Sequence, residues 1–281
     1  MYGYVIADVF TDTPLYGNPV AVFTDASGIT ATMMQRIAQE LHLSETTFVL
    51  PGDESADIGV RIFTPVNELP FAGHPALGTA VVLGESLGER FGDSLRMRTA
   101  NGVVPFTFER RGGRIVKATM CQPVPVWQPY EHAGTLLAGL GLSESTMSVD
   151  AYRNGPRHVF VGCSGIEELS AIDPDLRTLG RLPDMAAICF ATAETHWRMR
   201  MFSPAYGVAE DAATGSAAGP LAIHLIRHGR LAYSEWIEVR QGVEMGRPST
   251  MWASIRGEGD RIDAVRVSGA AVVVGRGELL L

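Results

Sequence analysis

The sequence Arg61-Ile62-Phe63-Thr64-Pro65 recurs 139 residues later as Arg200-Met201-Phe202-Ser203-Pro204. A second segment, Gly73-His74-Pro75-Ala76, recurs 142 residues later as Gly215-Ser216-Ala217-Ala218, so an insertion of three residues separates the two copies. Solenoid repeats have periods of roughly 20–50 residues. The much longer offset therefore predicts two duplicated domains, a number that also suits a chain of 281 residues.

Both copies have the same local order. A strand that ends in Phe-Thr/Ser-Pro is followed by an irregular loop, a glycine and a helix of small apolar residues. Small side chains on every side are typical of a helix that is closely surrounded by other structure. Pro75 suits a first helical turn, Ser216 suits an N-cap and Gly229 suits a helix end. We therefore expect an α+β protein in which each domain is a curved sheet or barrel around a central helix.

The boundary between the domains is expected near residue 118, giving domains 1–118 and 119–281, with the option that the C-terminal strand packs back on the first domain. Apolar residues at helical spacing predict helices at 31–43 and 75–87. Alternating patterns predict strands in the first half. These strands are residues 4–10, 20–23, 46–50, 58–63, 95–98, 103–109 and 115–120.

The composition is that of a globular protein, since 46% of the residues are hydrophobic and 19% are charged. No apolar run reaches the roughly 18 residues of a membrane span, and the N-terminus lacks the features of a signal peptide, so we expect a cytoplasmic protein with no membrane partner. The net charge is −8 and there is no basic tract, which argues against nucleic-acid binding. Lys117 is the one lysine among 23 basic residues, so any Schiff-base mechanism would have to use it.

No sequence pattern indicates a metal or an organic cofactor. Cys121, Cys163 and Cys189 are far apart, and we interpret all three as small buried apolar residues. His224 and His228 have the i, i+4 spacing of a metal-binding pair, but no adjacent acid completes the ligand set. We therefore expect no metal and no cofactor, with the histidine pair as the alternative.

The starts of the two central helices form the candidate site. Helix N-termini carry free N–H groups and a partial positive charge, and they bind anions such as carboxylates. A two-fold duplication would bring Gly73-His74 and Gly215-Ser216 face to face across a domain cleft. A small carboxylate substrate could then be held by backbone amides. The alternative is that the two glycines only permit tight turns.

Several acidic residues compete for a role in proton transfer. Glu45 lies between a predicted helix and an apolar strand, and Asp211 lies five residues before Ser216. A carboxyl group held against apolar neighbours has a raised pKa and can exchange protons near neutral pH. We interpret Glu68 and Glu210 as loop residues. A capping or surface role remains the alternative for Glu45, and His74 could either donate to a substrate or cap its helix.

Across these motifs the sequence resembles the PhzF family. The resemblance covers nearly the whole chain in the right order, which makes it far more specific than any single glycine pattern. The matching segments are Tyr16–Phe23, Leu43–Val49, Arg61–Pro65, Glu68–Pro75, Asn154–Gly162, Met201–Gly229 and Gln241–Ser249.

The resemblance implies a diaminopimelate-epimerase-like fold with the site between two similar domains, and it implies a homodimer. It also implies a cofactor-independent isomerase of phenazine biosynthesis. Such enzymes convert trans-2,3-dihydro-3-hydroxyanthranilate to the aminoketone 6-amino-5-oxocyclohex-2-ene-1-carboxylate. Carried over by motif, Glu45 moves a proton from ring C3 to C1, either by shuttling it or by assisting a sigmatropic shift. The implied site comprises Glu45, His74, Asp211 and Ser216 for catalysis, and Asn18, Gly73, Thr214 and Gly215 for substrate binding.

Three other functions stay open from the sequence. Amino-acid racemases and epimerases of this fold use two cysteines directly before the central-helix glycines. Here those positions are Ala72 and Thr214, which argues against a two-thiol mechanism. The second alternative is a PhzF-like isomerase of another small amino or hydroxy acid. The third is a non-catalytic metabolite-binding scaffold, although such a binder needs no acid like Glu45 or Asp211.

Overall fold

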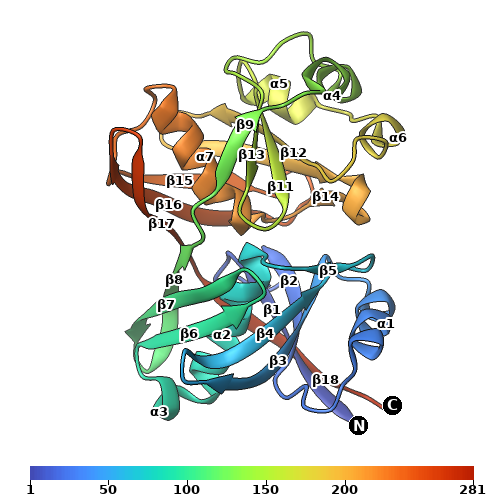
Figure 1. Ribbon diagram of the computed structural model, residues 1–281, viewed down its shortest axis with the longest axis vertical. Helices are drawn as coiled ribbons and strands as arrows, with labels where there is room; N and C mark the ends of the chain where they lie inside the picture. The colour runs from blue at the N-terminus through green and yellow to red at the C-terminus, as the bar shows by residue number, and fades with distance from the viewer.

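The computed structural model describes the backbone of residues 1–281 and every side chain except that of Glu89. The chain forms two lobes, with the N-terminal half below the C-terminal half in Figure 1. The elements of the first half are β1 (Tyr2–Val9), β2 (Asn18–Phe23), α1 (Ala31–Leu41), β3 (Glu45–Asp53), β4 (Ala56–Phe63), β5 (Glu68–Leu69), α2 (Gly73–Ser86), α3 (Gly88–Phe91), β6 (Ser94–Thr99), β7 (Gly102–Arg111) and β8 (Arg114–Gln122). The elements of the second half are β9 (Val126–Pro129), α4 (Ala133–Leu140), β10 (Asp150–Arg153), β11 (Arg157–Gly162), α5 (Ile166–Ala171), α6 (Leu176–Leu179), β12 (Ala186–Thr192), β13 (Trp197–Ser203), η1 (Pro204–Tyr206), β14 (Val208–Asp211), α7 (Gly215–Arg227), β15 (Trp236–Gln241), β16 (Ser249–Glu258), β17 (Arg261–Gly269) and β18 (Ala271–Leu279).

The two halves repeat the same strand pairing. β3 is antiparallel to β4 with Thr46 opposite Phe63, and β12 is antiparallel to β13 with Ala187 opposite Phe202. In both halves the next strand is short, β5 or β14, and leads into the central helix; in the second half the 3-10 helix η1 precedes it. The repeated sequence segments thus occupy equivalent strands, which confirms the predicted α+β duplication.

The central helices α2 and α7 are buried along most of their length. Residues 73–84 of α2 and 215–225 of α7 are all buried. α2 packs against β1, β2 and β8, and α7 packs against β16 and β17. The many Ala and Gly residues in these helices are explained by strands that surround them closely on several sides.

The two lobes share strands at their junction. β18 returns to the N-terminal lobe and pairs antiparallel with β1, so the two ends of the chain lie together at the bottom of Figure 1. β8 pairs with β17, placing Met120 opposite Val267. The last strand of the sequence is therefore part of the sheet that begins with the first strand.

Several local predictions are wrong. α1 ends after Leu41 instead of residue 43, because His42 adopts a left-handed conformation with φ 50° that terminates the helix. Ser216 is not an N-cap, since α7 begins at Gly215 and Ser216 lies within the first turn. Cys121 is only half-buried, unlike the other two cysteines.

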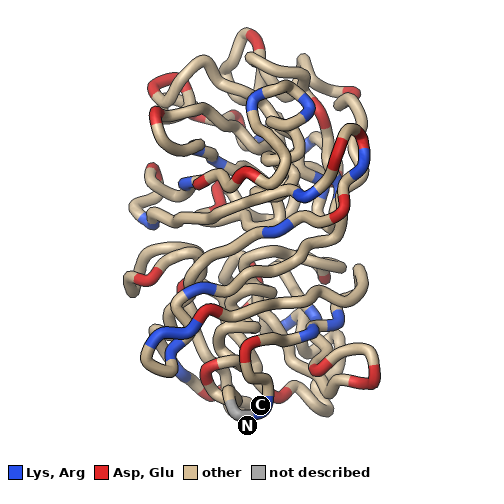
Figure 2. The backbone as a smooth tube through the Cα atoms, turned by 90° about the vertical axis from the view of Figure 1, so that its left-hand side faces the viewer, with Lys and Arg blue, Asp and Glu red and all other residues tan. Residues whose placement is uncertain are grey.

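Charged residues of both signs are interspersed along the chain in Figure 2, and neither sign forms a continuous tract. Among the residues that the structure describes, no helix is long and apolar enough to cross a membrane.

Candidate active site

The N-termini of α2 and α7 meet where the two lobes meet. A Cβ on Gly73 would lie 2.2 Å from the backbone nitrogen of Ser216, and a Cβ on Gly215 would lie 2.6 Å from the Phe10 ring. Neither glycine has a positive φ, so both serve close approach and not a tight turn. The backbone N–H groups of Gly73, His74, Gly215 and Ser216 donate to no backbone carbonyl, as expected in a first helical turn. The face-to-face arrangement predicted from the duplication is confirmed.

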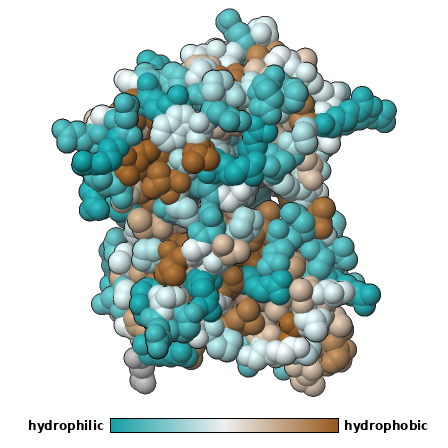
Figure 3. Space-filling model, viewed as in Figure 1, coloured by the Kyte–Doolittle hydropathy of each residue, from teal (hydrophilic) through white to brown (hydrophobic). Residues whose placement is uncertain are grey.

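A small cavity lies beside these helix starts, at the waist between the lobes that is visible in Figure 3. Its volume is about 30 Å³, roughly that of one water molecule. A six-membered ring acid is far larger than this enclosed space. The residues predicted for the site that line the cavity are Glu45, Gly73, His74, Asp211, Thr214, Gly215 and Ser216.

Glu45 is the first residue of β3, and its Oε2 lies 3.4 Å from Nε2 of His74. Neither atom has a hydrogen-bond partner among the described residues. Burial raises the pKa of Glu45 well above its usual value, and the Asp211 carboxylate raises it further. Burial also lowers the pKa of His74 to about 3, so its imidazole is neutral. Glu45 is thus neither a cap nor a surface residue, and it has the environment of a proton-transfer group.

Asp211 ends β14 and is surrounded by hydrogen-bond donors. Its Oδ1 accepts from Asn18 Nδ2 at 2.7 Å and from Ser44 Oγ at 3.2 Å. Its Oδ2 accepts from the Thr214 hydroxyl at 2.7 Å. Burial raises the pKa of Asp211, but these bonds favour its charged form and oppose that increase. When the two carboxyl groups share one proton, we therefore assign that proton to Glu45.

Asn18 lies at the edge of this network and connects the two lobes. Its Nδ2 donates to Asp211 and, at 3.0 Å, to the carbonyl oxygen of Ala213 just before α7. The same nitrogen is 3.2 Å from Nδ1 of His74. Asn18 therefore fixes the acidic group of one lobe against the imidazole of the other.

Two residues that the sequence analysis did not propose complete the C-terminal side. Nε2 of His158 lies 3.1 Å from the Ser216 hydroxyl, and burial lowers the pKa of His158 to about 3. Asn154 donates to the Ser216 carbonyl at 2.9 Å. Both residues belong to the segment Asn154–Gly162 already matched to the family, and a histidine within an apolar strand was the available signal.

The competing acids are neutralised by arginines outside the cavity. Glu68 pairs with Arg61 at 2.6 Å, and Glu210 pairs with Arg200 at 2.8 Å. Both acids lie in short strands, β5 and β14, so their interpretation as loop residues is wrong. These equivalent ion pairs join β4 to β5 in one half and β13 to β14 in the other.

Three of the four ring nitrogens of His224 and His228 lie within hydrogen-bond distance of neighbouring polar groups. Nδ1 of His224 lies 3.1 Å from the hydroxyl of Tyr152, and Nδ1 of His228 lies 2.8 Å from the His224 carbonyl. Nε2 of His228 is 3.0 Å from Ser148 Oγ. No group of three or more potential metal ligands occurs within the described part of the chain.

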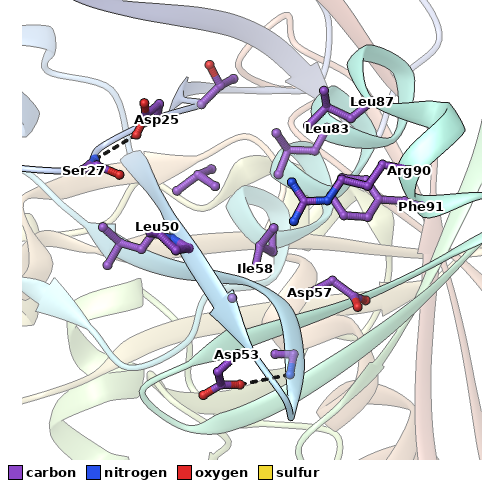
Figure 4. A pocket seen from close by; sticks show the side chains of 15 residues that line it. Asp25, Ser27, Leu50, Asp53, Asp57, Ile58, Leu83, Leu87, Arg90 and Phe91 are labelled. Carbon is purple, nitrogen blue, oxygen red and sulfur yellow. Dashed lines mark hydrogen bonds between the residues drawn. The ribbon is translucent and has the colours of Figure 1, made fainter.

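A larger hollow of about 560 Å³ lies elsewhere in the N-terminal lobe, between the tips of β3 and β4 and the end of α2 (Figure 4). Its carboxylates are already engaged in local structure. Asp25 accepts from the Ser27 N–H at 3.0 Å, and Asp57 accepts from the Arg96 N–H at 2.7 Å. Size alone does not make this hollow a reaction site, because none of the described side chains that line it is a free buried acid.

The family described as phenazine biosynthesis-like protein, PhzC-PhzF, matches residues 7–277. The chain belongs to this family. It is 54% identical over 281 residues to the trans-2,3-dihydro-3-hydroxyanthranilate isomerases of Pseudomonas aeruginosa and of Pseudomonas chlororaphis, with 100% of each chain covered. The resemblance inferred from the ordered motifs is confirmed.

Solved structures show the same fold. A phenazine biosynthesis protein of the PhzF family from Bacillus anthracis superposes with a TM-score of 0.84 at 26% identity, covering 100% of this chain and 99% of that one. A hydroxyproline epimerase from Agrobacterium vitis superposes with a TM-score of 0.69 at 13% identity, covering 99% and 90%. The second likeness bears on the fold alone, and it confirms the diaminopimelate-epimerase-like architecture.

Proposed function

We propose that this protein is a trans-2,3-dihydro-3-hydroxyanthranilate isomerase of phenazine biosynthesis. The observation that carries the proposal is the carboxyl of Glu45 beside the paired helix starts, because its Oε2 is buried and has no hydrogen-bond partner among the described residues. The full-length identity of 54% to isomerases of that name supports the choice of substrate.

In the proposed reaction Glu45 takes a proton from ring C3 and returns one to C1 on the same face. One proton leaves and one is added, so no oxidant, reductant or cofactor is consumed. The double bonds shift, and the enol that results tautomerises to the aminoketone. A carboxyl group with a raised pKa suits both halves of this transfer, because it is neither too weak a base nor too weak an acid near neutral pH.

The substrate carboxylate would lie at the two helix starts. The free amides of Gly73, His74, Gly215 and Ser216 provide donors there, and the two helix dipoles add partial positive charge. Asp211 would accept from the substrate amine. Closing the lobes over the ring would exclude water and fix the path of the proton.

The alternatives differ in what the purified protein does with this substrate. Incubation should cause rapid loss of the substrate absorbance, with phenazine precursors accumulating. Turnover of a different amino or hydroxy acid, with none of this one, would favour the broader PhzF-like isomerase. Binding without turnover of any such acid would favour the scaffold. Ala72 and Thr214 leave no thiol at the helix starts, so we do not propose a two-cysteine racemase.

The proposal includes a homodimer, as in the resemblance noted above, and sedimentation velocity at micromolar concentration would test it. A cytoplasmic location also stays a prediction, which fractionation of the producing cells would test.

A further inference from the structure

Gln241 lies outside the residues assigned to the site, but it is fully buried beside them at the end of β15. Its Oε1 accepts the N–H of Thr214 at 2.8 Å. Its Nε2 donates to the Asp211 carbonyl at 2.8 Å and to the Thr214 hydroxyl oxygen at 3.0 Å. Because the amide oxygen faces a donor and the amide nitrogen faces two acceptors, the orientation of the group is fixed.

This orientation sets the direction of the next hydrogen bond. Since the hydroxyl oxygen of Thr214 accepts from Gln241, its own hydrogen is directed to Oδ2 of Asp211, 2.7 Å away. The three residues form a chain of donors that ends on a carboxylate. Bonds donated to the charged form of an acid favour that form.

The N-terminal half has no such chain. Strand register makes Thr99 the equivalent of Gln241, because Thr99 is opposite Gly102 at the start of β7 and Gln241 is opposite Ser249 at the start of β16. The Thr99 hydroxyl stays within its own turn and donates to the Gly102 carbonyl at 3.0 Å.

The N-terminal half also lacks the residues that such a chain of donors would connect. Ala72 precedes the glycine of α2 where Thr214 precedes that of α7, and Leu69 occupies the register position of Asp211. The N-terminal half nevertheless builds the same strand, loop and central helix. The donor chain is therefore not needed to form this unit, and it accompanies the half that carries the carboxylate.

No positively charged side chain among those described lines the cavity, so none could stabilise the charged form of Asp211 in place of the donor chain. The titratable groups that line the cavity with Asp211 are Glu45, His74, His158 and Tyr206. Burial lowers the pKa of each of the two histidines to about 3, so both are uncharged, and Tyr206 is a neutral phenol. Hydrogen bonds, together with the dipole at the start of α7, thus stabilise a charge on Asp211 where no described side-chain cation does.

We propose that Gln241 is a positioning residue for the proton transfer: acting through the Thr214 hydroxyl, it keeps Asp211 ionised and leaves the exchangeable proton to Glu45. The inference rests on the proposed function, because it assigns a task to Gln241 within that reaction. It makes Thr214 a member of the donor chain in addition to any contact with substrate.

The first test measures the charge of Asp211 without any substrate. In protein carrying Glu45→Gln, the carboxyl ¹³C shift of Asp211 is titrated by NMR in three further variants. Thr214→Val removes the donor, Gln241→Thr installs the residue of the other half, and Thr214→Ser is the control that keeps a hydroxyl. We expect the pKa of Asp211 to be about one unit higher in the first two variants than in the control. Equal pKa values in all three would overturn the proposal.

The second test uses the intact Glu45. Gln241→Thr should lower kcat about tenfold while KM changes less than about threefold, because the loss is in orientation. In a Thr214→Val background the same substitution should lower kcat less than about twofold, because the chain of hydrogen-bond donors is already interrupted at residue 214. Equal losses in both backgrounds would mean that Gln241 only holds the loop, and would overturn the proposal.

The two tests separate the possible failures. If Gln241→Thr does not fold, as judged by circular dichroism, Thr214→Val against Thr214→Ser still decides whether a donor at this position controls Asp211. If the parent protein lacks isomerase activity, the proposed function fails, whereas the titration still decides whether the donor chain keeps Asp211 ionised.

Discussion

The two halves of the chain share one scaffold but bring different side chains to the cleft. Strand register puts Ala186 at the position of Glu45 and Leu69 at the position of Asp211. Each half thus supplies one carboxyl group where the other half has an apolar residue. Two opposed bases at equivalent positions would suit a racemase. Two carboxyl groups in unlike surroundings suit a reaction in which one accepts and returns a proton while the other stays charged.

The largest expected effect comes from removing the unpartnered acid. Glu45→Gln should lower kcat by at least about 100-fold, because the nearly isosteric amide cannot transfer the proton. Glu68→Gln is the matched control in the same half, since Glu68 is half-exposed and pairs with Arg61. Its kcat should stay within about threefold of the parent. Steady-state assays at saturating substrate measure both kcat values. A Glu45→Gln enzyme whose kcat is within tenfold of that of the parent would show that Glu45 is not the central proton-transfer group.

A smaller loss should follow from neutralising the acid of the other half. Asp211→Asn should lower kcat roughly 10- to 100-fold, because the amide carries no charge while the surrounding donors remain. Leu69→Met, at the equivalent position, conserves volume and should leave kcat nearly unchanged. The difference between these two variants measures how unequal the halves are. Similar losses in both would show that any change at this strand position disturbs the cleft.

The halves should behave alike in acid. Each buries one cleft histidine, His74 or His158, whose pKa falls from the usual 6.5 to about 3 on folding. Below pH 6.5 the two histidines take up protons in the unfolded chain but not in the folded protein. The free energy of unfolding should therefore be highest above pH 6.5 and should decrease as the pH falls toward 3. His158→Gln should flatten this decrease in denaturant titrations at about pH 7.5 and 5. An unchanged slope would mean that His158 is protonated in the folded protein.

We expect no effect on the reaction rate when metal ions are removed. The proposed transfer uses a carboxyl group in place of a metal, so dialysis against a strong chelator should leave the rate unchanged. A reproducible loss that added metal restores would redirect attention to His224 and His228 in the C-terminal half.

The architecture could be predicted from the sequence because the duplication preserved local patterns. The repeated strand ends and the small-residue helices were visible without any structure, and their pairing required only that two copies fold alike. Glu45, His74, Asp211 and Ser216 were identified through motifs, and the structure places all four around one cavity.

The residues that were missed act through long-range contacts. Gln241 is 27 positions from Thr214 in sequence, and nothing in its own neighbourhood indicates that its amide will span a loop. His158 is hard to assign from the sequence because a single histidine in an apolar strand is a weak signal that does not show which group it contacts. Ser216 was misassigned as a cap because its hydroxyl turns to His158 instead of to its own backbone.

The pairing of β18 with β1 has a consequence for synthesis on the ribosome. β1 pairs with β2, which follows it closely, and with residues 271–279, which are translated more than 260 residues later. Until those residues emerge, one edge of β1 is unpaired and open to other chains. The N-terminal lobe therefore completes its sheet only after the C-terminal lobe has been translated, which couples the assembly of the two lobes.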